Sequence, residues 1–242
     1  MWWGRKGDWH THIVAGHEVQ YWQPAKPLPF AVLYLPIDHA DFESSTQATD
    51  HLLQLNWPVI VPQVKQTWWL DRLIPSFDNT LSPAHWLLGP VFDWAATNWN
   101  ICRLAVVGIG TGGQGALRLG FCAPEKFPVV VSLDGSIALE KEYGKGTCLD
   151  HCFLSPEECR QHSVGMMINP RQVPRHLALF ANSSNTVHFR GNDRLHEKLR
   201  ALGVEHHADL QGDCTKTWWG EALQYSIRFM QQGMKAESRR LL

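Results

Sequence analysis

The chain has no segment typical of a membrane-bound or exported protein. No stretch approaches the roughly 20 consecutive apolar residues of a membrane span. The amino terminus begins MWWGRK, without the apolar core of a signal peptide. We therefore expect a cytoplasmic protein that does not contact a membrane.

Charge of one sign is also missing. The sequence has 22 Lys and Arg residues against 23 Asp and Glu residues, giving a formal net charge of −1, with no long basic run. A nucleic-acid surface needs a basic patch or stripe, so we expect no nucleic-acid partner. Internal repeats and low-complexity segments are absent as well.

Cysteine is too scarce to build a disulfide scaffold. Six cysteines in 242 residues are typical of a protein in a reducing compartment. Four potential metal ligands nevertheless lie close together in sequence. They are Cys148, Cys152, Cys159 and His162. Their types suit zinc, but their spacing matches no common zinc module, so buried free thiols are the favoured interpretation. We predict no metal and no cofactor.

Apolar segments alternate with helical ones along the chain. The length and a hydrophobic content of 44% suit one α/β domain over residues 1–242. Strands are predicted at 30–35, 58–62, 104–107, 129–133, 176–181 and 206–210, and an antiparallel edge strand at 18–22. Helices are predicted at 44–55, 83–97 with a kink at Pro90, 114–121, 193–202 with Gly203 ending it, and 218–234.

This alternation predicts a mostly parallel sheet with helices on both faces. Residues 134–175 form the longest stretch without a strand, and we interpret them as a modest lid over the carboxyl edge of the sheet. Ligands bind at that edge in folds of this kind.

A glycine-rich turn between a strand and a helix satisfies two motifs. Gly108, Gly110 and Gly113 fit the dinucleotide fingerprint G-x-G-x-x-G, and Asp134 lies about 20 residues on, where a ribose-binding acid is wanted. The same run fits the nucleophile elbow G-x-S-x-G, with Gly108 and Gly112 as flanking glycines. Gly110 then stands in place of the serine. A tight turn without a ligand is the third interpretation.

A resemblance favours the elbow. The run GIGTGGQGALRL at 108–119 resembles the elbow of the esterase D, S-formylglutathione hydrolase and antigen 85 group of α/β-hydrolases, whose pattern is G-x-S-M-G-G-x-G-A-L. The segments 68–78, 127–132 and 191–199 resemble the same group, and the likeness extends over about residues 30–229. It implies an α/β-hydrolase fold.

The resemblance also implies a Ser-Asp-His triad, and all three positions depart from it. Gly110 takes the place of the nucleophile. The acid falls at Asn185 or Thr186, in a loop without a carboxylate. The histidine falls at Cys214. Glycine, asparagine and cysteine cannot perform the hydroxyl, acid and base steps of this chemistry.

Other groups were weighed for a remaining site. Cys214 is the best substitute nucleophile, with His188, His39 or His207 as a base, although an inert thiol is favoured. The segment 134–136 ends a strand at the active edge and could line the pocket, although opening the lid is its favoured role. The oxyanion-hole and pocket candidates are Thr111, Ile37, Asp38, His39, Trp68, Trp69 and Trp218.

The leading functional hypothesis is an esterase-like protein without the triad that binds a small ligand or a protein partner and does not catalyse. The first alternative is an active carboxylic-ester hydrolase that uses atypical groups such as Cys214. The second is a nucleotide-binding module on the loop 108–113. The sequence leaves the ligand, the partner and a homo-oligomeric state open.

Overall fold

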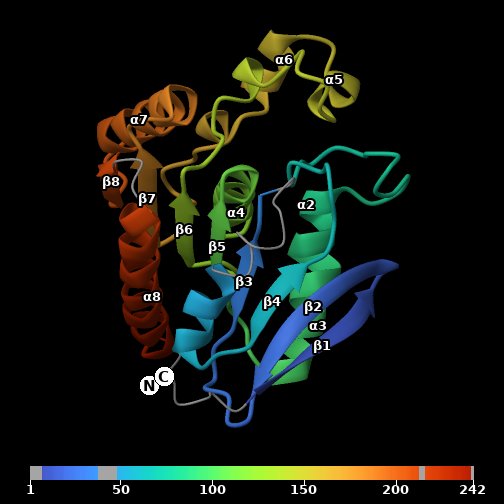
Figure 1. Ribbon diagram of the computed structural model, residues 1–242, viewed down its shortest axis with the longest axis vertical. Helices are drawn as coiled ribbons and strands as arrows, with labels where there is room; N and C mark the ends of the chain where they lie inside the picture. The colour runs from blue at the N-terminus through green and yellow to red at the C-terminus, as the bar shows by residue number, and fades with distance from the viewer. Residues whose placement is uncertain (1–6, 38–47, 213–215, 241–242) are drawn as a thin grey trace.

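The computed structural model describes residues 7–37, 48–212 and 216–240, with the backbone alone for 216–219. Its centre is an eight-stranded sheet in the order β1-β2-β4-β3-β5-β6-β7-β8 (Figure 1). The strands are β1 (Gly7–Val14), β2 (His17–Pro24), β3 (Val32–Leu35), β4 (Val59–Pro62), β5 (Ala105–Ile109), β6 (Val129–Leu133), β7 (His176–Asn182) and β8 (His207–Gly212). Strands β3 to β8 run parallel, so the predicted mostly parallel sheet is confirmed.

The antiparallel edge of the sheet differs from its prediction. The strand expected at 18–22 is β2, which pairs antiparallel with β4 but is not the edge. The edge is β1, which the sequence analysis missed because its side chains are almost all exposed and give no apolar signal. The two-residue turn at Ala15 and Gly16, with φ angles of 48° and 87°, joins β1 to β2, as a tight hairpin requires.

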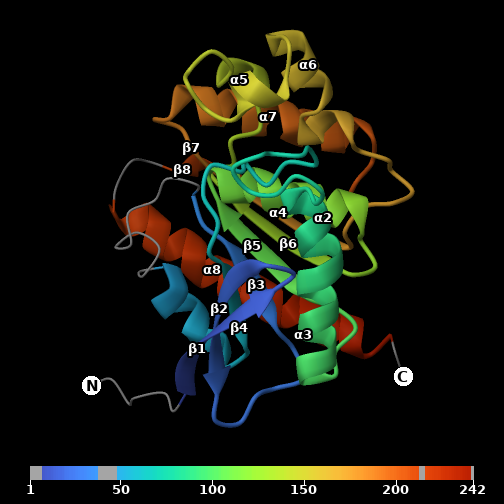
Figure 2. The same ribbon diagram turned by 90° about the vertical axis from the view of Figure 1, so that its right-hand side faces the viewer.

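Helices cover both faces of the sheet, as the sequence predicted (Figure 2). One face carries α2 (Pro83–Trp86), η2 (Leu87–Val91), α3 (Phe92–Trp99), α4 (Thr111–Cys122) and α7 (Thr186–Ala201). The other carries α8 (Lys216–Ser238) and the helical turns at 48–52 and η1 (Leu53–Leu55). The alternation along β3 explains the division, because Leu33 and Leu35 join the first core, whereas Val32 and Tyr34 join the second.

Two details of the helices bear on the predictions. The kink expected at Pro90 is confirmed as η2, a π-helical stretch between α2 and α3, because proline cannot donate the regular helical hydrogen bond. The helix predicted at 193–202 begins earlier, at Thr186, because the Asn185 side chain accepts a hydrogen bond from the His188 N–H at 3.3 Å and caps it. Gly203, with φ of 68°, follows its end as predicted.

The segment 134–175 holds only short helical elements above the sheet edge (Figure 1). They are η3 (Leu139–Lys141), α5 (Leu149–Cys152), α6 (Pro156–Gln161) and η4 (Val164–Met166). This segment shares a small third core with the loop before α2, in which Leu139, Leu149 and Phe153 pack against Trp68 and Leu70. No helix in the described ranges is both long and apolar enough to cross a membrane.

A buried carboxylate fixes the end of α8 to the sheet. The Glu237 side chain is 1% exposed, and its Oε2 accepts hydrogen bonds from Arg103 Nη1 at 2.9 Å and Arg175 Nη1 at 2.8 Å. His176 Nε2 lies 3.4 Å from Oε1, close enough for attraction but without the geometry of a hydrogen bond. Arg103 precedes β5, and His176 begins β7, so one side chain connects α8 to two strands.

Replacing this carboxylate leaves the Arg103 charge half-buried and without its partner. We expect Glu237→Ala to lower the free energy of unfolding by about 3 kcal/mol, measured by urea denaturation. Glu221→Ala, on the exposed face of the same helix, is the control and should stay within about 0.5 kcal/mol of the parent. Equal stabilities of the two variants would contradict the role of Glu237.

Candidate functional site

The turn between β5 and α4 has the backbone of a nucleophile elbow. Gly110 connects the two elements with φ of 56° and ψ of −117°, a strained conformation that only glycine adopts readily. Its N–H donates to the Leu133 carbonyl at 2.9 Å. Its own carbonyl accepts from the N–H groups of Gln114, at 3.2 Å, and Ser136, at 3.0 Å. The position predicted for a nucleophile is therefore built as a sharp turn, and it carries no side chain.

The flanking glycines are required by backbone contacts. A Cβ on Gly112 would overlap the carbonyl oxygen of Leu35, at the end of β3. A Cβ on Gly108 would overlap the carbonyl oxygen of Gly112. Strand β3, strand β5 and helix α4 therefore meet backbone to backbone, which is the reason that an elbow motif needs small residues on both sides.

Two of the predicted oxyanion-hole residues, Ile37 and Thr111, lie beside the elbow. A Cβ on Gly110 would stand 3.1 Å from Ile37 Cγ1, so the loop after β3 reaches the elbow as expected. Thr111 is the first residue of α4 and is buried. Asp38 and His39 lie outside the described residues, so their predicted positions are untested.

The loop predicted to hold the acid contains no carboxylate, and Asn185 has another role there. Its Oδ1 caps α7, and its Nδ2 donates to Asp134 Oδ2 at 3.3 Å. Thr186 is the first residue of α7. Cys214 lies outside the described residues, as does the side chain of Trp218, so convergence of Asn185 and Cys214 on Gly110 stays a prediction.

A different group of side chains gathers beside the elbow. His188 Nδ1 lies 3.0 Å from Asp134 Oδ2, and His188 Nε2 lies 3.0 Å from Ser136 Oγ. Sequence reasoning considered 134–136 as a lid opening and His188 as a base for Cys214, but did not connect the two. The sequence carried no signal for this contact, because it depends on the early start of α7, which places His188 in the first turn of the helix, over the end of β6.

Asp134 also bears on the nucleotide-binding alternative. Its carboxylate accepts hydrogen bonds from the Asn182 N–H at 3.2 Å and from Asn185, and it faces His188. Asp134 itself is buried. A ribose-binding acid must offer its oxygens to the ligand, so these contacts argue against the dinucleotide interpretation of Gly108, Gly110 and Gly113.

The two tryptophans expected in the pocket, Trp68 and Trp69, pack in the core. Trp68 and Trp69 are 4% and 1% exposed. The Trp69 ring lies against the backbone of α4, since a Cβ on Gly115 would come within 2.8 Å of it. The Trp68 carbonyl accepts a hydrogen bond from Gln114 Nε2. We correct the prediction accordingly, because both indoles are covered and neither faces an open cleft.

The proposed zinc ligands do not form a site. Within the described ranges, no three His, Cys, Asp or Glu side chains are arranged to hold a metal ion. His162 uses both ring nitrogens on the protein, Nδ1 at 2.9 Å from the Glu158 carbonyl and Nε2 at 3.0 Å from Arg72 Nη2. Cys159 is buried, and burial raises the pKa of its thiol to about 11.

His207 is not placed to act as a base near the elbow. It pairs with Ala178, toward the amino-terminal end of β7, whereas the elbow lies at the carboxyl edge. Its ring stacks on Tyr225 with 4.5 Å between centroids. Burial lowers the pKa of His207, which is consistent with a packed, neutral ring. His39, the other candidate base, lies outside the described residues.

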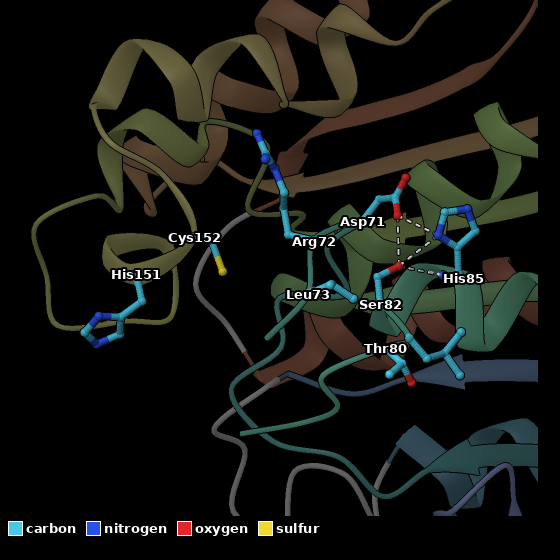
Figure 3. Close-up of a pocket in the computed structure, with 9 residues that line it drawn as sticks. Asp71, Arg72, Leu73, Thr80, Ser82, His85, His151 and Cys152 are labelled. Atoms are coloured by element: carbon cyan, nitrogen blue, oxygen red, sulfur yellow. Dashed lines mark hydrogen bonds and ion pairs between the residues drawn. The ribbon is translucent and has the colours of Figure 1, made fainter. Parts of the chain in front are cut away.

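A polar cavity of about 590 Å³ lies between the loop before α2 and α5. Figure 3 shows Asp71, Ser82 and His85 joined on one side and Cys152 and His151 on the other. His85 Nδ1 lies 3.0 Å from Ser82 Oγ and 2.8 Å from Asp71 Oδ1. Because one ring nitrogen faces both partners, this histidine cannot pass a proton from one to the other, and Ser82 Oγ is the cap of α2.

Comparison with solved structures identifies the fold. The chain is similar to a substrate-bound fluorophosphonate-binding serine hydrolase of Staphylococcus aureus, with 14% identity, a TM-score of 0.68 and coverage of 93% of this chain and 98% of that one. An S-formylglutathione hydrolase of the same organism gives 14% identity and a TM-score of 0.69, over 94% and 99% of the two chains. One from Agrobacterium tumefaciens gives 11% identity and a TM-score of 0.69, over 95% and 94%.

These likenesses, together with the strand order, show the α/β-hydrolase fold that the sequence predicted. The identities are too low to transfer an activity. No protein-family model matches the chain, and the search of curated protein sequences found no match.

The close approach at the elbow makes a testable prediction. In Gly112→Ala the new methyl group meets the Leu35 carbonyl, and backbone cannot yield as a flexible side chain can. We expect the free energy of unfolding to fall by about 3 kcal/mol or more.

The matched control is Gly89→Ala in η2, where an added Cβ meets nothing within 4 Å. Its stability should stay level or rise by up to about 1 kcal/mol. Chemical denaturation of both variants measures the difference. A Gly112→Ala protein as stable as Gly89→Ala would contradict the elbow geometry.

Proposed function

We propose that this chain is an esterase-like protein whose elbow does not carry a nucleophile and which binds a small ester- or acyl-type ligand beside the elbow, at the carboxyl edge of the sheet. The observation that carries the proposal is Gly110. It keeps the strained backbone of an elbow, with φ of 56° and ψ of −117°, and lacks the hydroxyl that would attack a substrate.

The rest of the predicted triad supports the same view. A serine hydrolase needs a carboxylate to orient its histidine. The loop after β7 has none, and Asn185 is used as a helix cap. The sequence places Cys214 where the histidine would be. Three replacements in one order favour loss of the chemistry at this position.

Two features beside the elbow suit the binding of a ligand, the amino terminus of α4 and the side chain of Ile37. Helix α4 begins at Thr111 directly after the elbow, and a helix amino terminus favours negative charge and carbonyl oxygens. Ile37 lies beside the elbow and offers apolar contact. The ligand class that fits is therefore a small molecule with a carbonyl or carboxylate group next to an apolar part. In this proposal the segment 134–175 acts as a lid over it.

The first test restores the missing hydroxyl. We expect Gly110→Ser to hydrolyse p-nitrophenyl butyrate no faster than the parent, because triad members work as a unit and a serine without base and acid gains little. A large gain would show that a functional base and acid are present after all. Ester hydrolysis by the parent protein that is lost in Cys214→Ala would also overturn the proposal, in favour of a cysteine-based hydrolase.

The second test measures binding with butyrate as the probe. Butyrate at millimolar concentration should raise the melting temperature relative to the same concentration of chloride, by the linkage between binding and stability. Ile37→Asp should abolish the rise, since Ile37 is 36% exposed beside the elbow and the new carboxylate would repel the probe.

Leu154→Asp is the control for this experiment. Leu154 is 93% exposed and lies in the segment between α5 and α6, so the same charge is added away from the elbow. It should keep the rise. No rise in the parent protein, or an equal rise in Ile37→Asp, would count against a binding site at the elbow.

A further inference from the structure

Three side chains beside the elbow form a hydrogen-bonded row from carboxylate to imidazole to hydroxyl. Asp134 Oδ2 lies 3.0 Å from His188 Nδ1, and His188 Nε2 lies 3.0 Å from Ser136 Oγ. The acid and the hydroxyl therefore face different nitrogens of one ring. This is the arrangement that activates a serine in hydrolases, where geometry rather than sequence order defines the roles.

The hydrogen-bond partners of Asp134 indicate which atoms of the three side chains carry hydrogens. The Asp134 carboxylate accepts from the Asn182 N–H and from Asn185 Nδ2, and an ionised carboxylate can only accept. His188 Nδ1 therefore carries a hydrogen and donates it to Asp134. In the neutral ring Nε2 is then the acceptor, and Ser136 donates its hydroxyl hydrogen to it. The histidine is thus held in the tautomer that a general base requires.

The backbone holds the row rigidly and next to the elbow. The Ser136 N–H donates to the Gly110 carbonyl at 3.0 Å. Asp134 has a φ of 47°, an uncommon conformation for a residue other than glycine, and its N–H donates to the Phe180 carbonyl at 2.7 Å. Asn192, fully buried on α7, donates to the carbonyls of Gly135, at 2.8 Å, and His188, at 2.9 Å. These bonds tie the first turns of α7 to residues 134–136.

The small exposed fractions of the three side chains limit which molecules can reach them. Ser136 is 5% exposed and Asp134 is 8% exposed, whereas the His188 side chain is 22% exposed. The imidazole is therefore the most accessible of the three side chains, and a reactant that reaches Ser136 must be small. The cluster of Asp71, Ser82 and His85 lacks this design, since its acid and hydroxyl share one ring nitrogen and its His85 side chain is 63% exposed.

We infer that Ser136, His188 and Asp134 form a hydroxyl-activating site that is separate from the elbow position Gly110 and accepts small acyl groups from activated carboxylic esters. The Ser136 oxygen attacks the ester carbonyl carbon while His188 Nε2 takes the hydroxyl proton. The bond to the leaving alcohol or phenol oxygen breaks, and that oxygen takes the proton from His188. The products are an acyl ester on Ser136 and the free alcohol or phenol.

Water can then hydrolyse the acyl ester by the same path. His188 removes a proton from water, the hydroxide attacks the acyl carbon, and the proton returns to the Ser136 oxygen, leaving a free acid. This activity goes beyond the proposed binding role of the elbow, and its acid, base and hydroxyl come from residues other than Gly110, Asn185 and Cys214.

The test is covalent labelling of the full chain with p-nitrophenyl acetate and, separately, with a small fluorophosphonate, followed by peptide mass mapping. We expect the adduct on Ser136 in the folded parent protein and its loss when the protein is unfolded in urea before labelling. A folded parent protein without label on Ser136 overturns the inference, and this result requires no variant.

Variants separate a catalytic row from a structural one. Ser136→Ala should remove the adduct, and His188→Gln should slow its formation by at least about 100-fold, the usual contribution of a general base. The control is Ser132→Ala, which removes a buried hydroxyl that has no hydrogen-bond partner among the described residues. It should label at the parent rate. Equal labelling of His188→Gln would show that the histidine only positions the loop.

The two proposals fail separately. Absence of a Ser136 adduct leaves the elbow proposal untouched, whereas a large gain in Gly110→Ser overturns the elbow proposal and leaves the Ser136 adduct of the parent protein as the separate test of the inference. A label mapped to Cys214 instead of Ser136 would contradict the inference and favour the cysteine-based alternative.

Discussion

The backbone contact between strand β3 and helix α4 is the constraint on which the edge of this fold depends. Gly112 lies against the Leu35 carbonyl, and Gly108 lies against Gly112, with no room for a Cβ at either position. The helix can approach the sheet this closely only if the chain turns sharply at Gly110. The sharp turn in turn directs the Gly110 carbonyl toward the N–H groups of Gln114 and Ser136. The start of α4 and the loop after β6 are therefore fixed by one residue.

The same constraint sets what this edge of the sheet can do chemically. With a serine at position 110, an elbow presents a hydroxyl in front of the α4 amino terminus. With glycine there, the strained backbone is relieved of its Cβ and the hydroxyl is gone, while the turn keeps its shape. Ser136, whose N–H donates to the Gly110 carbonyl, carries a hydroxyl that faces an imidazole.

The sequence predicted the strand and helix order well because the signals were local. The apolar runs of β5, β6 and β7 and the glycine frame of the elbow depend on neighbouring residues alone. Strand β1 was missed because an exposed edge strand has no apolar face. The early start of α7 was missed because its cap, Asn185, had been interpreted as a degenerate acid, and a capping asparagine looks the same in sequence as any loop asparagine.

The pairing of His188 with Asp134 and Ser136 could not be predicted, since it joins the loop after β6 to the first turn of α7, with 52 residues between Ser136 and His188, and depends on the register of α7. Had the helix begun at 193, residue 188 would lie in a flexible connection, and nothing would hold its ring. The Asn185 cap starts the helix three residues before His188, and Asn192 then bonds the carbonyls of both His188 and Gly135. Asn185, at the position where the sequence predicted the acid, therefore positions the imidazole, so the loop after β7 orients a histidine here through a helix cap.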